Sequence, residues 1–331
     1  MPVCRIYLFT YKRNELLKRA VKSLLAQTVT DWVCEVHNDL PDDEFPENYV
    51  NSLNDERFVV KKHGMNLGTT KSFNLAFTGC DEKYATILED DNWWEETFLE
   101  EMVNLMDADE KIDISWCNMQ IWKEYAGNIW QNTHKTIWPE KNSRLFTWPQ
   151  PEQALGALHS TGAMMFKGNK AKNYRIPADS LSNAVELIRE RCFEHPICLN
   201  AAILANFSQT IVTSQSKSME SWTGTQIMML ASYIKASNNI QEETRYLLRF
   251  YRKNKPSPIP VFFLAIFFYL KRPSLYFNLS IADWAIVIRW CLANMFNIKK
   301  LSRYLKEQSE TWEYLTNHTQ RFTRDYSLKI K

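Results

Sequence analysis

The stretch Tyr-Ala-Thr-Ile-Leu-Glu-Asp-Asp-Asn-Trp-Trp, residues 84–94, decides how the rest of this chain is interpreted. Its first five residues are mostly apolar and include β-branched side chains, which is typical of a short buried strand. Three acids follow, Glu89, Asp90 and Asp91, and their like charges repel one another unless a cation neutralises them. Carboxylate oxygens at the carboxyl end of a strand suit Mg²⁺ or Mn²⁺, so the stretch indicates a divalent-metal site. The structural alternative is an acidic cap on a following helix.

Composition places the chain among ordinary globular proteins. Of 331 residues, 45% are hydrophobic and 24% are charged. Forty basic residues oppose 38 acidic ones, which argues against nucleic acid as a partner. Seven scattered cysteines without a CxxC pair predict reduced core cysteines. Because the N-terminal residues do not resemble a signal peptide, we expect a cytoplasmic protein.

One apolar segment, residues 259–270, is too short to span a bilayer as a helix. Basic residues flank it on both sides, with Arg252 and Lys253 before it and Lys271 and Arg272 after it. Such a segment can lie on the inner face of the plasma membrane as a peripheral contact. It can equally be a buried core helix.

Strand and helix patterns alternate from residue 5 to residue 106, which predicts a doubly wound α/β domain. The expected strands are 5–10, 32–37, 57–62 and 84–88, and the expected helices are 15–27, 49–54, one that follows the loop at 66–74 and runs to about 78, and 95–106. Beyond them we expect strands at 112–120, 163–167 and 211–213, a helix at 182–192, and an irregular Trp-rich loop at 122–151. From residue 221 only helical patterns occur, at 223–237, 241–253, 259–270, 280–296 and 298–316.

Four of these pieces, in this order, resemble the family 2 glycosyltransferases. Residues 8–28, Leu-Phe-Thr-Tyr-Lys-Arg through Ala-Gln-Thr, look like the first strand and helix of that family. Residues 35–39 stand where the family has a strand ending in Asp-Asp-Gly. Asn66-Leu-Gly68 followed by Asn74 looks like the family's Asn-x-Gly loop, and residues 88–93 take the place of its DXD motif.

The resemblance implies a GT-A fold and a nucleotide-sugar donor site. Thr10, Tyr11 and Asp39 would line the nucleoside pocket, with Asp39 accepting a hydrogen bond from a uracil N–H and Tyr11 offering a flat face. Arg13 would also bind the donor. Lys71 would face the pyrophosphate or the uracil, although it can equally be a solvated helix residue.

By the same resemblance, the acids of the DXD stretch would bind the metal ion and the sugar part of the donor. Asp91 is expected to bind Mn²⁺ or Mg²⁺ with Glu89 in support, because alternate strand residues share a face. Asp90 would then reach the ribose or the sugar. The ion would stabilise the charge that develops on the leaving nucleoside diphosphate.

The general base is where this chain departs from the family pattern. Inverting members place a Glu-Asp pair at the start of a helix, and Ser182-Asn183 stands there in this sequence. Asparagine cannot act as a base. Asp179 is the first substitute and Glu186 another, with a loop or helix-capping role as the alternative. A retaining mechanism or an inactive enzyme would also fit the missing acid.

Aromatic residues after the acid stretch predict the acceptor side, because indole faces pack on sugar rings. The candidates are Trp122, Trp130, Trp138 and His159. For each tryptophan the alternative is a place in the aromatic core, and for His159 it is a structural role.

We therefore expect a GT-A mixed sheet flanked by helices over residues 1–215, with a donor half to about residue 120 and an acceptor half from 121, and a helical region over 216–331. The expected reaction is metal-dependent, inverting transfer from a UDP-sugar to a glycan or lipid-linked glycan, as in surface polysaccharide synthesis. The C-terminal helices could mediate homo-oligomer formation. The alternatives are a degenerate domain that only binds a glycan or a partner, and a nucleotidyltransferase, which the absence of glycine at 10–14 disfavours.

Overall fold

The structure is a computed structural model that describes residues 2–211, 219–254 and 258–327. The chain forms two compact units. The first contains the described residues of 1–147, 159–175 and 193–216, and the second those of 148–158, 176–192 and 217–331. The chain therefore contributes two short segments to the second unit before it begins the helical region.

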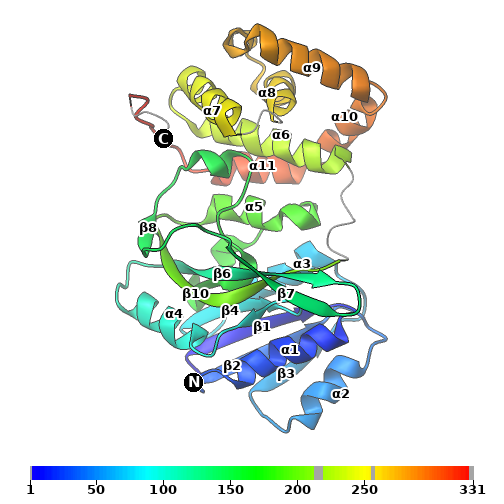
Figure 1. Cartoon of the computed structure of the whole chain (residues 1–331), viewed down its shortest axis with the longest axis vertical. Coiled ribbons are helices and arrows are strands. Elements are labelled where there is room, and N and C mark those ends of the chain that lie inside the picture. The colour runs from blue at the N-terminus through cyan, green and yellow to red at the C-terminus, as the bar shows by residue number, and fades with distance from the viewer. Residues whose placement is uncertain (1, 212–218, 255–257, 328–331) are drawn as a thin grey trace. The chain divides into compact units, whose positions relative to one another are not determined.

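The first unit opens with a β/α series whose strands lie side by side, with α1 and α2 packed beside them (Figure 1). Strands β1, β2, β3 and β4 pair in parallel in the order β3-β2-β1-β4. The elements are β1 (Cys4–Thr10), α1 (Asn14–Leu25), β2 (Trp32–Asn38), α2 (Phe45–Ser52), β3 (Phe58–Lys62), α3 (Thr69–Phe73), the 3₁₀ turn Asn74–Phe77, and β4 (Tyr84–Glu89).

Six further strands extend this sheet beyond β4, in the order β4-β9-β6-β10-β5, while β7 pairs with β6 and β8 with β10. Strand β9 is antiparallel to both β4 and β6, which makes the sheet mixed. The elements are β5 (Trp93–Trp94), α4 (Phe98–Asp107), β6 (Ile114–Tyr125), β7 (Ile129–Thr136), β8 (Arg144–Phe146), β9 (Met164–Lys167) and β10 (Ile197–Gln209).

Hydrogen bonds join the end of α1 to residues 95–99, which follow the three acids at 89–91. The side chain of Gln27, 5% exposed, donates to the Glu95 carbonyl at 2.8 Å and accepts from the Leu99 amide at 3.0 Å. Leu99 lies in the first turn of α4, where backbone amides lack partners within the helix. One buried amide side chain thus fixes the start of α4 against the end of α1.

The second unit is helical. Its long helices are α6 (Met219–Ala236), α7 (Ile240–Asn254), α8 (Ile259–Ala265) with a π-helical turn at Ile266–Leu270, α9 (Ile281–Asn294), α10 (Ile298–Glu307) and α11 (Ser309–His318). The short helix α5 (Val185–Arg189) also belongs to it. Within the described ranges no single helix meets the length and hydropathy expected of a membrane span, while the bent pair α9–α10 meets them only when taken together.

The expected fold class is confirmed, the structure corrects two elements, and for a third it favours one of the two alternatives that the sequence left open. The region 122–151 is not an irregular loop, because β6 continues to Tyr125 and pairs with β7. Strand β10 was not predicted, and the strand expected at 211–213 falls mostly on residues outside the described ranges. The segment 259–270 is chiefly a core helix, since Ile259, Phe262 and Ala265 are fully buried.

Candidate active site

Three parallel strands end at one edge of the sheet and bring the predicted donor residues together. Thr10 ends β1, Asp39 follows the last residue of β2, and Asp90 follows the last residue of β4. The backbone joins these ends directly, because the Asp39 amide donates to the Thr10 carbonyl and the Asp90 amide to the Phe9 carbonyl, both at 3.1 Å. Motifs that are far apart in the sequence therefore lie together at one edge of the sheet.

The carboxylate of Asp90 binds the end of β1. It accepts the Thr10 hydroxyl at 2.9 Å and the Tyr11 backbone amide at 3.1 Å, both on Oδ2. Asp90 and Thr10 are buried, whereas the Tyr11 side chain is exposed. The Tyr11 ring lies where the chain leaves the sheet, with the Lys12 ammonium 4.9 Å from its centroid.

Arg13 is the cation that faces the acids. Its guanidinium pairs with Asp91 and lies 3.4 Å from Asp90 Oδ1. Burial, together with the neighbouring Asp91 charge, raises the pKa of Asp90 to about 7. Burial also raises the pKa of Asp91, although Arg13 opposes that shift. Burial would lower the pKa of Arg13, but the charges of Asp91 and Asp90 outweigh it and leave the pKa raised.

Glu89 is oriented differently from its two neighbours. Its carboxylate accepts from the Asn92 side chain at 2.6 Å and lies against Gly162, where an added Cβ would be 2.8 Å from Oε2. The expectation that Glu89 and Asp91 share a face is wrong, because β4 ends at Glu89 and its alternation does not continue into the turn. Asp90 and Asp91 are instead the pair that shares a partner.

Asp39 organises the loop that precedes α3. Its two oxygens accept the backbone amides of Leu67 at 2.7 Å and Gly68 at 3.0 Å. Gly68 has φ +74°, a conformation that favours glycine, and it directly precedes α3. Asp39 therefore holds the loop 66–68 in place. Lys71, in α3, is exposed to solvent.

Arg19 is a site residue that the sequence analysis missed. It donates to the Asp91 carbonyl at 2.7 Å and to the Ser208 hydroxyl at 3.0 Å. Its guanidinium lies 3.9 Å from the ring centroid of Trp93 and 4.3 Å from that of Trp130. Burial lowers its pKa to about 10. The available signal was its position in α1, six residues after Arg13.

The predicted acceptor residues separate into two groups. Trp122 and Trp130 are half-buried and belong to the aromatic group around Arg19, since Trp122 packs on Trp93 with ring centroids 5.4 Å apart. Trp138 and His159 are buried and both pack on Trp116. Their predicted contact with an acceptor is therefore corrected to a core role, because neither ring presents an open face.

The two candidate bases belong to the second unit. Asp179 is half-buried and accepts the Thr311 hydroxyl at 2.9 Å through Oδ1. Its Oδ2 is buried and has no hydrogen-bond partner within the described ranges. Glu186 lies in the first turn of α5 and is half-buried.

We call residues 89–91, which carry the three acids, the acid turn. The acid turn fits a hard divalent cation only in part. Mg²⁺ typically binds one or two carboxylates and completes its shell with water and substrate phosphates, and Asp90 with Asp91 supply that number. Both carboxylates are buried and pair with the same guanidinium, that of Arg13. Two negative groups thus face one positive group, which leaves room in charge for a further cation. No group of three or more His, Cys, Asp or Glu side chains suited to a metal occurs among the described residues. Phosphate oxygens would therefore have to complete the site.

A mixed sheet of this order, with buried acids after β2 and β4 beside Thr10 at the end of β1, is that of an α/β domain of the GT-A type. Residues 6–169 match the model of the family described as Glycosyl transferase family 2, and over these residues the chain belongs to that family. It is also 32% identical over 94 residues to the putative colanic acid biosynthesis glycosyl transferase WcaA of Escherichia coli (strain K12). That match covers 28% of this chain and about a third (34%) of the relative's length.

Solved structures show the same fold. TarS of S. aureus, residues 1–349 in complex with UDP, superposes with a TM-score of 0.58 at 12% sequence identity, covering 96% of this chain and 90% of that chain. The same protein in complex with UDP-GlcNAc gives a TM-score of 0.57 at 12% identity, covering 96% and 91%. At these identities the likeness concerns the fold alone, which is that of GT-A glycosyltransferases.

Proposed function

We propose that this protein is a glycosyltransferase that binds a nucleotide-sugar, with a UDP-sugar favoured, and transfers the sugar to a glycan or lipid-linked acceptor. The observation that carries the proposal is the convergence of Thr10, Asp39 and the acid turn at one sheet edge. The family match over residues 6–169 supports it, and a relative named for colanic acid biosynthesis favours a polysaccharide as product.

In this proposal the nucleoside lies between the ends of β1 and β2. The Tyr11 ring is exposed beside Asp90 and can pack on the base. Asp39 holds the loop 66–68, so it positions the backbone that borders the base. Lys71 follows this loop in α3, where its positive charge would favour a diphosphate. Each contact depends on a residue at a strand end or in the loop beside it.

The acid turn is the proposed diphosphate end of the site. Asp91 and Asp90 would hold Mn²⁺ or Mg²⁺, which when bound supplies positive charge to the leaving nucleoside diphosphate. Glu89, held by Asn92, would then support the turn rather than the ion. Arg13 keeps the same carboxylates paired and oriented, and its charge is available to phosphate oxygens as well.

Asp179 remains the proposed general base of an inverting transfer. The Thr311 hydroxyl donates to Oδ1 of Asp179, which fixes the orientation of the carboxylate. A carboxylate in this role takes the acceptor hydroxyl proton as the new glycosidic bond forms at the sugar C1, while the bond from C1 to the diphosphate oxygen breaks and the nucleoside diphosphate leaves. Glu186 is the second candidate and serves as its control.

The donor site is tested by thermal shift with UDP, with and without Mn²⁺. A ligand at one hundred times its Kd stabilises the protein by about 2.7 kcal/mol, so a shift of several degrees is expected. Asp91→Asn should abolish the Mn²⁺-dependent part, whereas Asp31→Asn, at an exposed acid in the same unit, should keep it. The absence of any shift with a panel of nucleotides would refute the donor site.

The base is tested by separating binding from turnover. Asp179→Asn should keep the UDP-dependent shift and lose transfer by about 100-fold or more, the usual contribution of general base catalysis. Glu186→Gln should retain transfer. If Asp179→Asn transfers sugar at the normal rate, the assignment fails, and loss of transfer in Glu186→Gln alone would move the role to Glu186.

A further inference from the structure

Helix α9 is apolar on the side that faces solvent. The helical spacing of its exposed large residues gives one continuous stripe, because they recur at intervals of three, four and seven positions. Ile281 is 91% exposed and Phe296, just after the helix, is 86% exposed. We call this face the α9 stripe: Ile281, Trp284, Ile288, Leu292, Met295 and Phe296.

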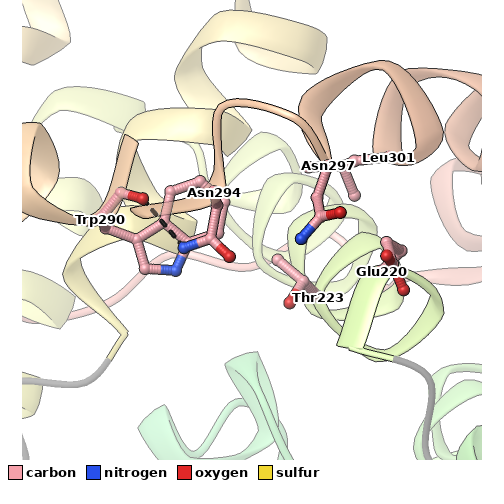
Figure 2. A pocket seen from close by; sticks show the side chains of 6 residues that line it. All are labelled: Glu220, Thr223, Trp290, Asn294, Asn297 and Leu301. Carbon is pink, nitrogen blue, oxygen red and sulfur yellow. Dashed lines mark hydrogen bonds between the residues drawn. The ribbon is translucent and has the colours of Figure 1, made fainter. Parts of the chain in front are cut away.

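The opposite side of α9 already has partners within the second unit. Val287 and Asp283 are buried, and Asp283 pairs with Arg252 of α7. Figure 2 shows Trp290 and Asn294 at one end of a small cavity that Glu220 and Thr223 of α6 also line. The cavity that these residues border encloses about 10 Å³, roughly the space of one water molecule, so this side is packed.

Trp284, at one side of the α9 stripe, packs on Phe263 and Tyr276, but the rest of the stripe is exposed and apolar where a surface helix normally carries polar residues. A further large apolar residue shortly before α9, Phe277, is 89% exposed. Contiguous exposed apolar surface of this kind usually marks an interaction site. In Figure 1, α9 lies at the edge of the helical unit, coloured orange.

Charge around the stripe identifies the partner. Between Glu243 and Glu307 the sequence contains a single acid, Asp283, and that acid is buried and paired. Exposed bases occur on α9 and on the segments before and after it in the sequence: Lys271, Arg272, Arg289, Lys299, Lys300 and Arg303. A second copy bound face to face would bring these bases together and repel. An anionic lipid surface can bury the apolar side chains of the α9 stripe and attract the neighbouring bases to its head groups.

We propose that the α9 stripe docks on a membrane surface rich in anionic lipid, with α9 lying in the plane of the interface and the α10 bases contacting head groups. The proposal places the membrane contact on α9 rather than on residues 259–270, whose apolar side chains are mostly buried. It goes beyond the transfer reaction, and its test uses neither donor nor turnover, so it can fail or succeed independently.

The test is flotation of the full chain with vesicles of phosphatidylcholine mixed with phosphatidylglycerol, and with phosphatidylcholine alone. Binding is expected with the anionic vesicles and should weaken at high salt. Ile288→Ser with Leu292→Ser should lower the partition coefficient by about tenfold or more. Lys299→Glu with Lys300→Glu should lower it by about tenfold or more through charge alone.

Ile129→Ser is the matched control, because Ile129 is a comparably exposed isoleucine in the first unit, and it should bind as the unaltered protein does. Circular dichroism and Tm establish that each variant is folded. Failure of the unaltered chain to bind anionic vesicles overturns the proposal, as does binding that the α9 variants leave unchanged. A dimer by light scattering that Leu292→Ser dissociates, without vesicle binding, would assign the stripe to a second copy instead.

Discussion

At the scale of single residues, Arg13 is the group on which the acid turn depends most. Replacing it with methionine keeps the apolar stem and removes the charge that Asp90 and Asp91 share. Both carboxylates are buried, so the loss should lower the free energy of unfolding by about 1.5–3 kcal/mol. Urea denaturation at neutral pH measures this change.

A second substitution separates charge from packing. Arg13→Met combined with Asp91→Asn removes one of the two repelling carboxylates and should recover part of the lost stability. Arg175→Met, at an exposed arginine of the same unit, should change little. If the double variant is as unstable as Arg13→Met, the contribution of Arg13 is not electrostatic.

His63 gives the molecule a pH-dependent contact. Its Nε2 lies 3.3 Å from Nδ1 of His37, and the two rings stack with centroids 5.4 Å apart. Burial, with a smaller effect of His37, lowers the pKa of His63. The unfolded chain then binds the proton more readily, so stability falls as the pH drops through about 6.5, the ordinary histidine pKa.

His63→Phe keeps the stacked ring and cannot be protonated, so its free energy of unfolding should decline less between pH 7.5 and 5.5. His134→Asn alters an exposed histidine at φ +55°, where asparagine is tolerated, and should leave the pH dependence unchanged. Denaturation curves at the two pH values decide the matter. An equal decline in His63→Phe and the unaltered chain would show that another group is responsible.

The acids themselves were predictable, but their partners were not. Asp90 and Asp91 follow a recognisable buried strand, so their position at the sheet edge follows from the sequence. Their common contact with Arg13, and the different orientation of Glu89, depend on the turn that begins where β4 ends. Arg19 was missed because its place between Trp93 and Trp130 requires contacts far apart in the sequence.

At the scale of elements, the prediction succeeded where strands and helices alternate and failed where strands are amphipathic or interrupted. Strand β7 is mostly exposed or half-buried and carries few aliphatic residues, so its sequence looks like a loop. Strand β10 has register shifts near Ile203, which break the alternation that identifies a strand. Both strands are stabilised by pairing with β6, a tertiary contact that local pattern does not contain.

The contact between α6 and α10 depends on one glycine. A Cβ on Gly224 would lie 2.4 Å and 2.6 Å from ring carbons of Tyr304, whose hydroxyl is 3.0 Å from that of Thr225. Gly224→Ala should therefore force the helices apart and lower the free energy of unfolding by about 1–3 kcal/mol, despite the better helix propensity of alanine. Gly64→Ala, which meets no atom within 4 Å, is the control. A Gly224→Ala variant of normal or higher Tm would contradict this packing.

At the scale of the whole molecule, the sequence predicts two parts but not their interleaving. The change to helical patterns near residue 216 is visible in the hydrophobic spacing. Segments 148–158 and 176–192 nevertheless belong to the helical unit. Buried contacts within that unit explain their membership, such as the Arg191 guanidinium donating to the Gln153 carbonyl at 3.0 Å and the Met229 carbonyl at 3.1 Å. No local pattern indicates that these short segments pack with distant helices.

The proposed donor site unites segments that are distant in sequence, so ligand binding should protect all of them together. The amides of Tyr11, Leu67 and Gly68 already donate to Asp90 or Asp39, and their exchange with solvent requires local opening. With UDP and Mn²⁺ bound, hydrogen exchange should slow at residues 10–13, 66–71 and 89–92 at once, because opening any one of them would cost ligand contacts. In Asp91→Asn the Mn²⁺-dependent protection should disappear at all three segments. Protection confined to one segment would mean that the three strand ends do not form one binding site.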